Sequence, residues 1–152
     1  MNGTDIARGG RTVGHVGDLS PVEIEAVRAL RGWDQRGSDD EPERSAGEAC
    51  LSQICQACMS HGRRPFVRHG VTCACLGADE ACFAAMVHSA SMGDREDATL
   101  FAALLVRPDM APYLAGLAEQ FGLALRRDQV MRDRAASFAS AGAGSMRPAL
   151  LH

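Results

Sequence analysis

The chain has 152 residues, the size of one domain, which can bury a core without needing a metal or a disulfide in order to fold. Its aromatic content is only 5%, so the core must be built mainly from Leu, Ala, Val and Met, which favours helices over a β-sandwich. The formal net charge of −3 argues against a dedicated nucleic-acid-binding protein, since such proteins are usually basic.

Residues 1–19 are rich in Gly, Thr and charge and show no hydrophobic periodicity, which predicts a flexible arm. They contain no apolar segment of the kind found in signal peptides, and no run in the chain approaches the ~20 apolar residues of a membrane span. We therefore expect a cytoplasmic protein without a membrane partner. Its six cysteines would stay reduced there, as buried thiols, metal ligands or redox groups.

A first helix is predicted to begin at Ser20. Ser20 and Glu23 have the spacing of a capping box, and Pro21 suits the first helical position. The segment 34–45 that follows is acidic and contains glycine and proline, so we interpret it as a solvated loop.

A second capping box, formed by Ser45 and Glu48, predicts the next helix. His61 closes its last turn, where a cation suits the helix dipole, and Gly62 is expected to supply a left-handed residue after it. One face of this helix carries apolar side chains and thiols at helical spacing: Leu51, Ile54, Cys55 and Cys58.

Three more helices are expected after an irregular loop at 62–77. The first begins near Asp79 and Glu80, which we interpret as acids at the positive end of a helix dipole. Asp94 and Asp109 are expected to cap the other two, and Gly122 to end the last.

The predicted fold is therefore all-α: a compact bundle of about five helices, with the irregular Cys/Arg-rich loop between the second and third. The helical domain is expected to cover residues 20–127. Residues 128–152, rich in Ala, Ser, Gly and Arg, are expected to form a flexible or partly helical tail.

The most distinctive pattern is a pair of cysteines, Cys55 and Cys58, separated by fourteen residues from a second pair, Cys73 and Cys75. Two close pairs joined by a loop are typical of a tetrahedral zinc site. Four thiolates also suit an iron–sulfur cluster, and the alternative to both is unrelated buried thiols. The histidines that could replace a thiolate are His61 and His69.

Three arginines lie among these cysteines: Arg63, Arg64 and Arg68. They are the only charged side chains between Ala49 and Ala78, so the stretch carries +3. They would favour thiolate formation or balance a metal–thiolate centre. They could also contact an anion such as nucleic-acid phosphate, or form an ordinary solvated surface.

The function predicted from this pattern is that of a small, non-enzymatic, zinc-binding accessory or regulatory protein, which acts through a protein or nucleic-acid partner. The alternatives are an iron–sulfur or thiol-based redox sensor and a metal-free helical protein–protein interaction module. An enzyme is the least supported class, because the spacing supports no acid–base constellation and no Cys–His nucleophile pair. The sequence does not determine the oligomeric state.

Overall fold

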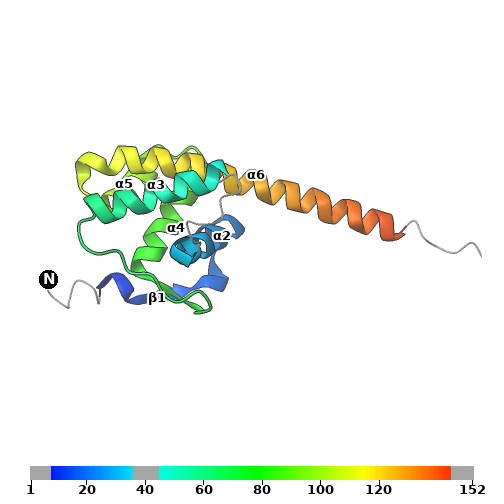
Figure 1. The fold of residues 1–152 in the computed structure, drawn as a ribbon, viewed down its shortest axis with the longest axis horizontal. Helices are drawn as coiled ribbons and strands as arrows, with labels where there is room; N and C mark the ends of the chain where they lie inside the picture. The colour runs from blue at the N-terminus through cyan, green and yellow to red at the C-terminus, as the bar shows by residue number, and fades with distance from the viewer. Residues whose placement is uncertain (1–7, 36–44, 145–152) are drawn as a thin grey trace, which may run out of the picture.

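The structure is a computed structural model that describes residues 8–35 and 45–144. Within these residues the fold is a compact, mostly α-helical bundle with a small two-stranded sheet at one side (Figure 1). This confirms the predicted fold class, with the Cys/Arg-rich loop between the second and third helices of the bundle. None of the described helices is both long and apolar enough to cross a membrane.

The elements follow one another in a simple order along the chain. They are β1 (Thr12–His15), the 3-10 turn η1 (Val16–Asp18), α2 (Pro21–Gly32), the 3-10 turn η2 (Trp33–Gln35), α3 (Ala46–His61), β2 (Cys75–Gly77), α4 (Ala78–Ser91), α5 (Arg95–Leu105), the 3-10 turn η3 (Pro108–Met110) and α6 (Ala111–Gly144).

The strand β1 differs from the flexible arm expected for residues 1–19. It pairs antiparallel with β2, with Thr12 opposite Gly77 and His15 opposite Cys75. A strand of four residues shows no useful periodicity in sequence, and its hydrogen-bonding partner lies far along the chain. The prediction failed here because the pairing is not a local property.

Both predicted capping boxes are present. Ser20 accepts a hydrogen bond from the backbone N–H of Glu23, whose carboxylate in turn accepts from the backbone N–H of Ser20. Ser45 and Glu48 make the same reciprocal pair at the start of α3. These local signals therefore placed the starts of α2 and α3 correctly.

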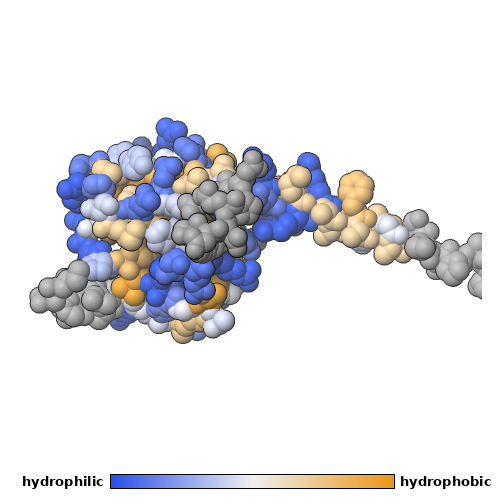
Figure 2. Space-filling view, viewed as in Figure 1, coloured by the Kyte–Doolittle hydropathy of each residue, from blue (hydrophilic) through white to orange (hydrophobic). Residues whose placement is uncertain are grey.

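The helix α6 is much longer than expected. The predicted end at Gly122 is wrong, because the helix continues through the segment 123–127 to Gly144. Its outer part leaves the bundle as a single helix (Figure 1). Beyond a charged base, this projecting part is mostly apolar on its surface (Figure 2).

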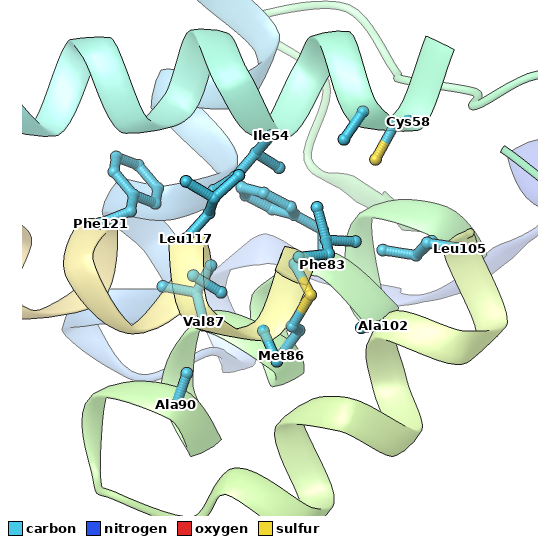
Figure 3. Packing of buried hydrophobic residues seen from close by; sticks show 14 of the residues in the cluster. Ile54, Cys58, Phe83, Met86, Val87, Ala90, Ala102, Leu105, Leu117 and Phe121 are labelled. Atoms are coloured by element: carbon cyan, nitrogen blue, oxygen red, sulfur yellow. The ribbon is translucent and has the colours of Figure 1, made fainter. Parts of the chain in front are cut away.

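The core is centred on α4, which packs against α2, α5 and α6, while α3 packs against α6. Phe83 and Met86 of α4 are fully buried, and Ile54 of α3 faces them across the core (Figure 3). The rings of Phe83 and Phe121 lie with their centroids 6.3 Å apart in a tilted arrangement. Burial of these side chains is the main favourable contribution to folding.

Gly122 marks a close approach of two helices. A Cβ at this position would lie 2.7 Å from Cβ of Ser91 and 2.9 Å from the carbonyl oxygen of Val87, both on α4. The glycine is therefore required by the contact between α6 and α4, and it does not end the helix.

Replacing Gly122 with alanine should destabilise the protein by about 1–3 kcal/mol, the usual effect of overpacking a core. Gly116, on the same helix, has no atom within 4 Å of the position its Cβ would take. Gly116→Ala should instead stabilise by about 0.5–1 kcal/mol, because alanine is the better helix former. Urea unfolding of both variants checks this, and equal effects would disprove the close contact.

Gly62 also departs from expectation. It has φ −63° and ψ 143°, an extended conformation, so the predicted left-handed residue after α3 is wrong. A side chain at this position would collide with the carbonyl of Cys58 and lie 3.0 Å from that of Arg64. Gly62 instead forms an isolated antiparallel bridge with Val106, at the junction between α3 and the loop.

Candidate thiol site

The loop 62–77 is held against the bundle by two acids at the start of α4. Asp79 is 2% exposed and Glu80 is fully buried. Their position in the first turn of α4 agrees with the helix-dipole interpretation. An interaction with the dipole does not require burial, because exposed acids at a helix start also provide it. Their burial shows a further role that the sequence pattern does not reveal, which is that they bind the loop.

Glu80 forms a buried, bidentate ion pair with Arg31 of α2. The distances are 2.7 Å from Nε of Arg31 to Oε1 and 2.9 Å from Nη2 to Oε2. The carboxylate also accepts the backbone N–H groups of His69, at 2.9 Å, and Gly77, at 3.0 Å. Burial raises the pKa of Glu80, but the hydrogen bonds from Arg31 and these two N–H groups outweigh it and leave the pKa lowered.

The same arginine fixes the backbone of the second cysteine pair. Nη1 of Arg31 donates to the carbonyl of Cys73 at 2.6 Å, and Nη2 donates to that of Cys75 at 2.7 Å. Two carbonyls that point to one guanidinium from alternate residues indicate an extended segment. Side chains at alternate residues of such a segment lie on the same face, so the two thiols face the same way.

The three loop arginines bind within the protein. Arg64 pairs with Asp79 through two hydrogen bonds of 2.8 and 2.6 Å, and Asp79 also accepts the backbone N–H of Val67. Arg68 donates to the carbonyl of Leu30 and pairs with Asp34 at 2.9 Å. Arg63 donates to the carbonyl of Ala103. Carboxylates therefore balance two of the three positive charges predicted to face a partner.

Cys73 lies beside a histidine. Its Sγ is 3.8 Å from Nδ1 of His69, and Nε2 of His69 is 2.8 Å from the carbonyl oxygen of Gly10. Since a carbonyl can only accept, Nε2 carries a proton, which in the neutral ring leaves Nδ1 free to accept from the thiol. The backbone N–H of Cys75 and then His69 lower the pKa of Cys73, while the Gly10 carbonyl is the main group that raises the pKa of His69.

The structure thus brings a cysteine and a histidine into contact, although the spacing in the sequence was not expected to support a Cys–His nucleophile pair. A nucleophile, a base in contact with it and a third group that orients the base are the parts of an activated thiol. The pair is joined by a tight turn, in which the backbone N–H of Cys73 donates to the carbonyl of Gly70 at 3.0 Å. The sequence signal that could have indicated the pair is a histidine, His69, that is followed directly by Gly70 and lies four residues before Cys73.

The first cysteine pair has a different environment. Cys55 and Cys58 are buried on α3, and burial raises the pKa of each thiol to about 12. Both thiols therefore stay protonated at neutral pH, and their pKa values are shifted in the opposite direction to that of Cys73. In the parts of the chain that the structure describes, no three His, Cys, Asp or Glu side chains are arranged to hold a metal.

The two histidines predicted as possible substitutes for a thiolate ligand, His61 and His69, lie in different parts of the structure. His61 lies at the end of α3, with Nδ1 3.3 Å from Nη2 of Arg107. His69 is the one that contacts a cysteine of the predicted set. In the described residues, the structure thus joins His69, Cys73 and Cys75 in one site and leaves Cys55 and Cys58 in the core.

Comparison of the chain with protein-family models, with curated proteins and with solved structures finds no match.

Proposed function

We propose that the protein is a thiol-based redox sensor in which Cys73 reacts with a peroxide and Cys75 then forms a disulfide with it. The observation that carries this proposal is the contact between Cys73 and His69, with His69 oriented by the Gly10 carbonyl. Redox-sensing cysteines typically have a low pKa, are accessible and lie next to a second cysteine that resolves the oxidised form. Cys73 is partly exposed, its pKa is lowered from the ordinary value of a thiol, and Cys75 lies two residues away.

The chemistry proceeds in two steps. The thiolate of Cys73 attacks one peroxide oxygen, so that an S–O bond forms, the O–O bond breaks and hydroxide leaves with a proton from His69 as water. The sulfur of Cys75 then attacks the sulfenic sulfur of Cys73, forming S–S and releasing a second water. Two thiols are oxidised and one peroxide is reduced; a small-molecule thiol, itself oxidised to its disulfide, restores the starting state.

Oxidation of Cys73 and Cys75 would affect the strand β1, which pairs with the backbone at Cys75. Ala74, between the two cysteines, accepts a hydrogen bond from the backbone N–H of Val16 at 2.9 Å, and Cys75 pairs with His15. A disulfide between Cys73 and Cys75 would tilt this backbone away from its present extended form. We expect the pairing of β1 with β2 to weaken as a result, which supplies the change that a partner would detect.

Hydrogen peroxide treatment followed by mass spectrometry tests the proposal. The wild-type protein should lose two hydrogens on oxidation and give a crosslinked peptide that contains Cys73 and Cys75. Cys75→Ser should stop at a sulfenic acid on Cys73, which a dimedone probe would trap, and Cys73→Ser should show neither product. Cys82→Ser is the control, because burial raises the pKa of Cys82, and it should behave as wild type. Oxidation that is equally fast at Cys82 and Cys73 would reject the sensor.

The zinc site remains a prediction. A centre that used Cys55, Cys58, Cys73 and Cys75 together would require the loop to move toward α3 and the two buried thiols to ionise. Metal analysis of the protein purified anaerobically tests it: about one zinc per chain would favour the structural site, and iron with sulfide the cluster.

A second candidate function is protein–protein interaction through the outer part of α6. Its large apolar side chains are exposed, Met131 by 60% and Phe138 by 82%. A helix with few tertiary contacts is only marginally stable in water, so a partner that covers this apolar face would stabilise it. In this proposal the protein partner binds the outer part of α6, and the loop arginines are not required for the contact.

Amide hydrogen exchange tests this candidate. Exchange in residues 127–143 should be fast in dilute protein, because most of these residues are exposed and the tertiary ion pair described for them, between Arg132 and Glu25 of α2 at 3.8 Å, is a long one at the surface. Raising the protein concentration tests a second copy as the partner: exchange there should slow, and Phe138→Ser should remove the slowing. No change with concentration excludes self-association. The variant should leave the free energy of unfolding within about 0.5 kcal/mol of wild type.

A further inference from the structure

A pocket of about 140 Å³ lies between α2, α3, α4 and the loop 62–77. The helix α3 contributes the largest share of its wall, with Ile54, Cys55 and Cys58. Phe83 of α4 forms the opposite side, and Figure 3 shows it facing Ile54 and Cys58 across the core. The pocket is separate from the Cys73 site, since neither Cys73 nor His69 lines it.

Three aromatic side chains line the pocket: Trp33, Phe66 and Phe83. The indole N–H of Trp33 already donates to Oγ of Ser52 at 3.1 Å, so the ring offers its apolar surface. Sulfur atoms complete the wall, because Cys55, Cys58 and Met59 line it as well. Aromatic faces and polarizable sulfur both favour contact with another aromatic ring.

No free charge faces the pocket from its lining residues. Arg68 is the charged group among them, and it is held by the carbonyl of Leu30 at 2.8 Å and by Asp34 at 2.9 Å. The thiols of Cys55 and Cys58 are protonated. A charged ligand would lose part of its hydration and meet only an arginine that is already paired, which favours an uncharged ligand over an ionic one.

We infer that this pocket binds a small, uncharged molecule with a single aromatic ring. An apolar cavity of about 150 Å³ in another protein is known to stay dry and to bind benzene, so the volume here suits one ring. The segment that follows η2 in the sequence, residues 36–44 (Arg-Gly-Ser-Asp-Asp-Glu-Pro-Glu-Arg), contains no large apolar side chain that could serve as an alternative occupant. The inference is independent of the redox proposal, because it uses none of the same side chains.

Fluorescence provides a direct test, because Trp33 is the single tryptophan of the chain and lines the pocket. Iodobenzene quenches tryptophan on contact through its heavy atom. Titration of the full-length protein should give saturable quenching, which benzene should relieve by competition. Cys58→Phe adds a ring inside the pocket and should weaken iodobenzene binding at least about tenfold, equivalent to about 1.4 kcal/mol. Leu100→Phe adds the same ring at an exposed position of α5 and should bind as wild type.

Two outcomes would overturn the inference. One is quenching that rises linearly to the solubility limit of iodobenzene, with no competition by benzene, which indicates only collisional contact. The other is saturable quenching that Cys58→Phe leaves unchanged while circular dichroism shows that the variant is folded, which places the ligand elsewhere. If Cys58→Phe does not fold, the wild-type protein still decides: benzene must raise its thermal unfolding midpoint in a saturable manner.

Discussion

Replacing Glu80 with alanine should lower the free energy of unfolding by about 3–5 kcal/mol, the usual effect of removing one partner of a buried ion pair. Arg31 would keep its charge in a buried site, with its side chain only 3% exposed and no carboxylate beside it. The backbone N–H groups of His69 and Gly77 would lose their acceptor at the same time. Urea unfolding of the wild type and the variant measures the difference.

A matched control separates this effect from the loss of a helix-start acid. Glu96 occupies the first turn of α5 but is exposed, and no described carboxylate–arginine pair involves it. Glu96→Ala should therefore cost less than about 1 kcal/mol, the usual contribution of a charge at a helix terminus. If both substitutions had equally small effects, Glu80 would act only through the helix dipole.

The same carboxylate makes stability depend on pH in a defined direction. The pKa of Glu80 is lowered from its ordinary value of 4.5, so the folded protein holds the ionised form more strongly than the unfolded chain does. Its contribution is fully present above about pH 4.5 and is lost as the pH falls through the lowered folded value. Glu80→Gln, which cannot ionise, should flatten this part of the stability profile, measured by urea unfolding across the acid range.

The sequence predicted those parts of the fold that depend on neighbouring residues. Ser20 and Ser45 were placed correctly as helix starts, because a capping box is complete within four residues. Gly122 was misinterpreted as a helix end, because the same glycine serves a contact with Val87 and Ser91 on another helix. Local chemistry fixes where a helix begins, whereas tertiary packing decides whether a glycine ends it.

The candidate site could be predicted only in part from the sequence, because it also depends on tertiary packing. The sequence identified the cysteines and arginines of the loop, but Arg31 lies 49 residues before its partner Glu80 and reads as an ordinary helix residue. The division of the four cysteines into a core pair and a loop pair also depends on how the loop folds back. Spacing shows which thiols are close along the chain, whereas burial and hydrogen-bonding partners determine the direction in which the pKa of each is shifted.

The largest effect expected at the thiol site concerns His69. Because the pKa of Cys73 is lowered from 9.0, the alkylation rate of Cys73 by iodoacetamide should reach half its maximum below pH 9.0. His69→Ala removes the hydrogen-bonding partner 3.8 Å from Sγ, so the profile should shift to higher pH and the rate at neutral pH should fall several-fold. Site-resolved mass spectrometry follows Cys73 and uses Cys55, with a pKa raised to about 12, as a slow internal reference.

The His69→Ala variant tests the effect of the imidazole on Cys73 and leaves in place the ion pair that holds the loop. Glu80 binds the backbone N–H of His69 and not its ring, so the Arg31–Glu80 network should survive the substitution. The unfolding midpoint should accordingly change far less than in Glu80→Ala. His61→Ala is the matched histidine control, since His61 contacts Arg107 and not a cysteine, and its Cys73 profile should match wild type. If His69→Ala and His61→Ala gave the same profile, the lowered pKa of Cys73 would have to come from the backbone N–H of Cys75, and His69 would have no part in activating the thiol.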